Sequence, residues 1–177
     1  MKIALIILGL ALVIFIGYGL YKANGLKTIQ IVKKVTIKGQ MPVVFDMVRY
    51  LNNFPKWSPF LKQDPAQKYE VKGKDGEPGA QYHWIGNGGK DVGYQEIVKV
   101  DTFSLVSMKC HIEKPFTAHP DFVYTFSESP AGITVTQTFK LESDLGSAFF
   151  LWLFGAKKEM EKTNENGLEL LKQSIEK

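Results

Sequence analysis

The sequence predicts an α+β fold in which a strongly curved antiparallel sheet surrounds a long C-terminal helix, with one transmembrane helix in front. Three observations predict this architecture. Segments of alternating apolar and polar residues, separated by turn signals, follow one another between residues 29 and 142. A helical period of apolar residues runs from about Ala156 to Ser174. An uncharged run of 19 residues, Ile3 to Tyr21, precedes both.

The composition is that of one domain of ordinary size behind this apolar run. Of the 177 residues, 45% are hydrophobic and 12% aromatic, which indicates a large apolar interior. The net charge of +4 comes from basic residues scattered along the chain, and Arg49 is the only arginine. Both facts argue against a nucleic-acid partner. The single cysteine, Cys110, excludes an internal disulfide and a multi-cysteine metal site, and its apolar neighbours predict a buried, inert thiol.

The N-terminal run is long enough to cross a bilayer. A helix needs about 20 apolar residues to span the hydrocarbon core, and tyrosines at one end suit its interface. A cleaved signal peptide is the competing interpretation, with Lys2 as its charged start. Because residues 3–21 exceed the usual signal-peptide core and no small-x-small cleavage site follows them cleanly, we expect residues 1–24 to be an uncleaved anchor ending in a short break. The lysines on both sides leave the membrane side of the domain open.

The domain is expected to begin with a strand, a short helix and a rigid corner. Residues 29–37 alternate as a strand does, and Pro42 suits the first turn of an amphipathic helix that ends near Leu51. The corner, residues 51–60, holds three aromatic residues and two prolines. Since a residue before proline prefers extended geometry, Phe54 and Ser58 are predicted to be non-helical. The corner is either a plug of the core or a wall of a binding cavity.

Six more strands follow, each bounded by glycine, proline or aspartate. Their alternation is typical of antiparallel strands with one solvated face, and residues 86–89 are a hairpin signal. The predicted strands are Lys68–Lys72, Gln81–Ile85, Val92–Val100, Ser104–Glu113, Asp121–Ser127 and Ile133–Glu142.

Aromatic side chains gather on the faces that we expect to point inward. Phe122, Tyr124 and Phe126 share one face of their strand, and Gln137 and Tyr124 place polar groups among apolar neighbours. Such a set suits an amphiphilic ligand, whereas a solid core is the alternative that the sequence leaves open. The cavity candidates are Trp57, Tyr82, Trp84, Phe116, Phe122, Tyr124, Phe126, Gln137 and Phe139.

The sequence offers no catalytic residues, metal ligands or cofactor site. His83 lies between Tyr82 and Trp84, so it faces the other side of its strand, and no carboxylate is paired with it by local spacing. His111 belongs to a polar outer face and His119 to a turn. Nothing in the spacing of the three histidines indicates a metal site.

A second apolar run, residues 148–154, is too short to span a bilayer. It is either the buried first turn of the long helix or an exposed flap at the cavity mouth. As a flap it would touch the membrane surface through Phe149, Phe150 and Trp152.

The order of several short motifs resembles the START-like superfamily, in particular the polyketide cyclase/dehydrase and lipid-transport (SRPBCC) group. The resemblance spans about residues 30 to 175. Its residues are Pro42 with Val44-Phe45-Asp46, the corner Phe54-Pro55-Lys56-Trp57-Ser58-Pro59, Asp64-Pro65, Pro78-Gly79-Ala80, Tyr82-His83-Trp84 with Gly86-Asn87, Glu96-Ile97 and Gly167-Leu168.

The resemblance implies a helix-grip fold over residues 25–177 with an apolar cavity between sheet and helix. Most members of the group bind a lipid or another hydrophobic ligand, and a minority catalyse ring closure or hydrolysis. We therefore expect non-catalytic binding or transport of a hydrophobic small molecule at a membrane. A polyketide cyclase or hydrolase, and a membrane-tethered interaction or stress-response module, are the alternatives. The ligand and the oligomeric state stay open.

Overall fold

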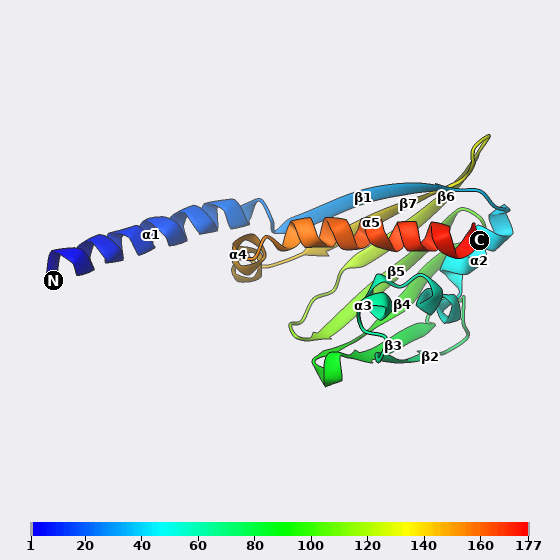
Figure 1. The fold of residues 1–177 in the computed structure, drawn as a ribbon, viewed down its shortest axis with the longest axis horizontal. Coiled ribbons are helices and arrows are strands. Elements are labelled where there is room, and N and C mark those ends of the chain that lie inside the picture. Colours follow the sequence, from blue (N-terminus) through cyan, green and yellow to red (C-terminus); the bar gives the residue numbers. More distant parts are fainter. Residues whose placement is uncertain (1, 177) are drawn as a thin grey trace.

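The computed structural model describes residues 2–176 and has the predicted α+β fold (Figure 1). Seven antiparallel strands form one sheet in the order β1-β7-β6-β5-β4-β3-β2. The strands are β1 (Thr28–Ile37), β2 (Lys68–Lys72), β3 (Gln81–Gly86), β4 (Asp91–Asp101), β5 (Leu105–Lys114), β6 (Asp121–Ser129) and β7 (Gly132–Glu142). The α-helices are α1 (Lys2–Asn24), α2 (Met41–Arg49), α3 (Pro59–Gln63), α4 (Leu145–Leu153) and α5 (Ala156–Ile175), and the 3₁₀ helices are η1 (Leu51–Lys56) and η2 (Asn87–Gly89).

The long helix α5 lies across one face of the curved sheet, and α1 projects away from the domain at one end (Figure 1). The pairing of β4 with β5 shifts register at Val92/Gly93 and again at Ile97/Lys99. Such irregularities bend a strand and increase its twist, which helps the sheet to curve around the helix. The predicted fold class is therefore confirmed.

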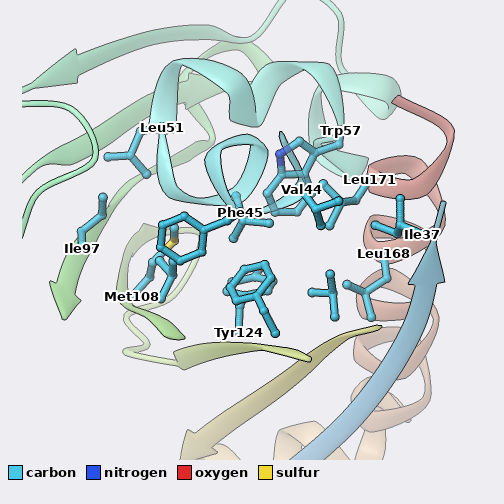
Figure 2. Packing of buried hydrophobic residues seen from close by; sticks show 14 of the residues in the cluster. Ile37, Val44, Phe45, Leu51, Trp57, Ile97, Met108, Tyr124, Leu168 and Leu171 are labelled. Carbon is cyan, nitrogen blue, oxygen red and sulfur yellow. The ribbon is translucent and has the colours of Figure 1, made fainter. Parts of the chain in front are cut away.

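The main hydrophobic core lies at the end of the sheet where α2 packs. The buried face of α2 consists of Val44, Phe45 and Val48. These side chains meet Leu171 of α5 and Trp57 in one cluster (Figure 2). This end of the domain is therefore filled with close-packed side chains.

The predicted corner is held by a distant loop. Asp75, between β2 and β3, accepts hydrogen bonds from the backbone N–H groups of Leu51 (2.6 Å) and Asn52 (3.2 Å), the first residues of η1. This carboxylate satisfies donors that a helix start leaves free. The prediction that Phe54 is non-helical was wrong, because the capped 3₁₀ turn includes it. Ser58 is extended as predicted, and its hydroxyl caps α3.

The second apolar run forms a helix of its own. Asp144 caps the start of α4, and Gly155, with φ +61°, separates α4 from α5. The alternative of a buried first turn of the long helix is therefore wrong. The Trp152 ring of α4 lies 5.6 Å from Phe15 and 6.0 Å from Tyr18 of α1, measured between ring centroids. The other side of α4 is open, since Phe150 is 58% exposed.

The N-terminal helix is one continuous apolar rod. The large side chains from Ile3 to Ile16 are 42–75% exposed, and the buried residues, Gly19 and Ala23, lie in the last two turns. By length and composition, α1 is the one helix within residues 2–176 that is able to cross a membrane.

Candidate ligand-binding cavity

The concave face of the sheet and α5 enclose a cavity of about 490 Å³. This volume falls within the range of about 300–1,000 Å³ that is typical of small-molecule sites. The domain is therefore hollow, which answers the question that the sequence left open. Eight of the nine residues predicted as cavity candidates line it: Trp57, Tyr82, Trp84, Phe116, Phe122, Tyr124, Gln137 and Phe139.

Phe126 is the exception among the predicted residues. It lies on the same face of β6 as Phe122 and Tyr124, but nearer to the end of the sheet that α2 covers. There its ring packs edge-on against Phe45, with 5.2 Å between the ring centroids. The side chains of α2 fill the space in front of Phe126, so this residue belongs to the solid core and not to the cavity wall.

The corner serves both of the roles that the sequence suggested. Trp57 is 3% exposed, and its indole Nε1–H donates to the backbone carbonyl of Met47 over 3.1 Å. The same side chain lines the cavity together with Phe54 and Phe60. The corner is thus a plug of the core on one side and a wall of the cavity on the other.

Several lining residues were missed by the sequence analysis. The face of α5 toward the cavity presents Met160, Thr163, Asn164 and Gly167. The helical period of α5 indicates which of its residues face the sheet, but periodicity does not distinguish a residue that touches the sheet from one that faces a void. Asn164 carries no sequence signal, because it is a polar residue within an apolar period.

The cavity opens at the end of the domain that carries α1. Among its lining residues, Phe60, Phe116 and Phe154 are 45%, 55% and 75% exposed, so they mark the rim. Phe154 directly follows α4. Phe116 lies in the loop between β5 and β6. The first residue of β6 pairs with Lys140, near the end of β7 that pairs with the start of β1. One rim residue, Phe154, therefore lies beside α4, and a second, Phe116, lies in the loop at the same end of the sheet.

The wall of the cavity contains a few buried polar groups. The side-chain Nε2–H of Gln137 donates to the hydroxyl of Tyr124 over 2.9 Å. The Gln137 Oε1 atom and the Tyr82 hydroxyl have no hydrogen-bond partner among residues 2–176. Gln95, on the same face of the sheet, is also buried against the cavity. The wall is thus apolar with a small number of polar points, the arrangement that orients an amphiphilic molecule.

The wall is uncharged over most of its area. Burial raises the pKa of the Cys110 thiol to about 12 and also raises the pKa values of Tyr82 and Tyr124 above their ordinary value. These groups therefore stay protonated near neutral pH. The charged lining residues among those described are Asp91 and Glu159. Asp91 accepts from the indole of Trp84 over 3.0 Å.

The histidines lie on the outer face of the sheet. Tyr94 is stacked between His83 and His111, with ring centroids 5.0 and 4.4 Å away, and His119 stands edge-on to His111. Partial burial is the largest cause that lowers the pKa values of His83 and His111. Residues 2–176 contain no group of three or more histidine, cysteine or carboxylate side chains that is able to hold a metal ion.

Comparison with known proteins identifies the fold. No protein-family model matches the chain, and no curated protein matches its sequence. Among solved structures, protein CV1439 from Chromobacterium violaceum matches with a TM-score of 0.61 and 10% identity, covering 84% of this chain and 98% of that one. Aha1 from Colwellia psychrerythraea matches with a TM-score of 0.58 and 14% identity, covering 84% and 96%.

A third solved structure, Ara h 8.0201, matches with a TM-score of 0.55 and 13% identity over 81% of this chain and 98% of that one. At these identities the likeness concerns the fold alone. The chain therefore has the helix-grip, or Bet v 1-like, fold that the sequence predicted.

Proposed function

We propose that this chain is a membrane-tethered member of the START-like superfamily that binds a lipid or another hydrophobic small molecule without changing it chemically. The observation that carries the proposal is the cavity of about 490 Å³ between the sheet and α5. Its wall is mostly aromatic and aliphatic, and its rim is made of exposed phenylalanines. Burial of an apolar ligand against such a wall is favourable.

The tether in this proposal is α1. Its 23 residues span roughly 35 Å at about 1.5 Å per residue, enough to cross a hydrocarbon core of about 30 Å. Exposed isoleucine and leucine side chains suit lipid on all sides. The two last turns are tied to the domain, because a Cβ atom added to Gly19 would lie 2.6 Å from the Trp152 ring. Removal of α1 as a signal peptide would uncover that face of α4, which favours a retained helix.

The apolar surface of α4 is the second membrane contact in this proposal. Phe150, Leu153 and Phe154 are 58%, 43% and 75% exposed and lie together beside the end of α1. An exposed apolar patch next to a membrane anchor is suited to rest in the interfacial layer. Because Phe154 also borders the cavity, this placement would let a ligand pass between the bilayer and the cavity without crossing water.

The position of the histidines favours binding over catalysis. A cyclase or hydrolase needs a general acid or base within hydrogen-bond reach of its substrate. His83 and His111 lie on the outer face of the sheet, away from the lining residues. Of the two carboxylates at the cavity, Asp91 accepts the indole proton of Trp84 and Glu159 pairs with Lys162 over 2.8 Å. Both carboxylates thus already have partners.

The test is to identify what the full chain carries when it is purified in detergent. Thr163 on α5 lines the cavity, so Thr163→Phe fills part of it, whereas Asn166→Phe adds the same ring to an exposed position of the same helix. Lipids are extracted from the wild type and both variants and compared by mass spectrometry. A compound present in the wild type and in Asn166→Phe, but lost from Thr163→Phe, is the expected result. Identical extracts from all three proteins would overturn the proposal.

A further inference from the structure

The cavity wall contains one polar pair with unused hydrogen-bonding capacity. Gln137 of β7 and Tyr124 of β6 stand opposite each other in the sheet, and each is 4% exposed. The Gln137 Nε2–H group donates to the Tyr124 hydroxyl, which leaves Gln137 Oε1 without a partner among residues 2–176. A tyrosine hydroxyl that accepts one hydrogen bond still has its own proton to donate. The pair, whose two residues line the cavity, thus contains an unused acceptor and an unused donor side by side.

A hydroxyl group on the ligand is able to bond to the Gln137 acceptor and the Tyr124 donor at the same time. Its proton donates to Gln137 Oε1, and its oxygen accepts from the Tyr124 O–H group. Buried polar atoms are costly to leave unpaired, so a ligand that satisfies this pair is favoured over a pure hydrocarbon of the same size. The hydroxyl of Tyr82, 1% exposed and also without a partner among the described residues, is a second polar point on the same wall.

The charges around the cavity exclude an anionic group at this depth. Its lining within residues 2–176 contains no lysine, arginine or histidine, while Asp91 and Glu159 are both acidic. A carboxylate or phosphate would lose its hydration and gain no cationic partner, which is unfavourable. Free fatty acids in their ionised form and phospholipid headgroups therefore do not suit the interior.

We propose that the cavity selects neutral lipid alcohols, molecules with a long apolar body and a terminal hydroxyl, and that Gln137 with Tyr124 forms the hydroxyl subsite. This inference rests on the proposed function and assigns a ligand class to the same cavity. The apolar walls bind the hydrocarbon body, and the polar pair distinguishes an alcohol from an acid or an alkene.

The inference is tested with three radiolabelled probes of equal chain length: oleyl alcohol, oleate and 1-octadecene. The full chain is reconstituted in nanodiscs, and binding is the probe retained in excess of empty nanodiscs of the same lipid. We expect oleyl alcohol to bind about tenfold more tightly than 1-octadecene, because one hydroxyl makes two buried hydrogen bonds. Oleate at neutral pH should bind most weakly of the three.

Two variants isolate the subsite. Gln137→Met keeps a side chain of similar length without the amide, and Tyr124→Phe removes the hydroxyl. Each should reduce the alcohol's advantage over 1-octadecene to about twofold or less while 1-octadecene binding persists, which also reports that the variant is folded. Thr138→Val, next to Gln137 on the outer face of β7, is the control and should keep the tenfold advantage.

The outcomes distinguish a failure of the hydroxyl subsite from a failure of the proposed ligand-binding function. If 1-octadecene binds but oleyl alcohol has no advantage, or if the advantage survives in both variants, the hydroxyl subsite is refuted and the apolar cavity stands. If oleate binds as tightly as the alcohol, the selection for neutral ligands is refuted. If no probe exceeds empty nanodiscs, the proposed function itself fails.

Discussion

The two ends of the domain use similar aromatic segments in opposite ways. At the α2 end, the corner of residues 51–60 is pinned by polar groups: Asp75 caps its backbone and Met47 accepts the indole proton of Trp57. At the other end, α4 lies beside the end of α1 (Figure 1), and Phe150 and Phe154 are largely exposed. An aromatic segment whose polar partners lie on other elements of the domain becomes part of the core. One whose cap is local, as the Asp144 cap of α4 is, remains available for an external apolar surface, which we propose to be the bilayer.

The largest expected effect comes from comparing a tryptophan at each end. Trp57→Ala should lower the free energy of unfolding by about 3–5 kcal/mol, because the ring is buried and the Met47 carbonyl loses its donor. Trp152→Ala should change it by less than half as much, since that ring packs against α1 and against Phe149 of its own helix at the margin of the domain. Chemical denaturation followed by far-UV circular dichroism measures both. Equal losses would show that the two ends are equally part of the core.

A smaller effect is expected for the aspartates that cap the two segments. Asp75→Ala should lower the free energy of unfolding by about 1–2 kcal/mol, since it removes the cap of η1 and unties the β2–β3 loop. Asp144→Ala removes the cap of α4. The Asp144 carboxylate accepts from the Ser147 backbone N–H on a fully exposed surface, so its loss should lower the free energy of unfolding by less than the loss of Asp75 does. Thermal denaturation of both variants measures the difference. A larger loss from Asp144→Ala would place α4 in the folding core.

The smallest effect concerns the cavity between the two ends. The pKa of Cys110 is raised from 9.0 to about 12 in the folded chain, mainly by burial. The unfolded thiol therefore ionises first, and the stability that the buried thiol contributes is fully present below pH 9.0 and is lost as the pH rises toward 12. Between pH 8 and 10 this loss should be about 1 kcal/mol. Cys110→Ala should lack this part of the loss of stability at alkaline pH, measured by denaturation of both proteins at each pH. If the free energy of unfolding depended on pH identically in the wild type and in Cys110→Ala, water would reach the thiol.

The strands were predictable because their information is local. Alternating residues and intervening glycines place each strand to within about two residues, and the helical stripe of α5 is equally plain. The 3₁₀ turn at Phe54 was not predictable, since the carboxylate that caps it lies 24 residues away at Asp75. That contact joins η1 to the loop between β2 and β3, and no local sequence pattern indicates it.

The residues that line the cavity could largely be predicted from the sequence, but the point along the sheet where the cavity ends could not. Alternation identifies which side chains point inward, and eight of the nine predicted residues do line the cavity. Alternation does not show where a neighbouring helix fills the space, which is why Tyr124 borders the cavity and Phe126, two residues later, lies in the core. The unpaired oxygen of Gln137 could not be predicted either, because it depends on the pairing of β6 with β7.

The most direct test of the central claim uses the tryptophans as reporters. Trp57 and Trp84 line the cavity, so in a Trp152→Phe background both remaining indoles belong to its wall. The full chain in nanodiscs is mixed with oleyl alcohol brominated across its double bond, which quenches nearby tryptophan fluorescence. We predict strong quenching in this background and a loss of most of it when Thr163→Phe is added. Equal quenching with and without Thr163→Phe, or none in either, would contradict a ligand-holding cavity.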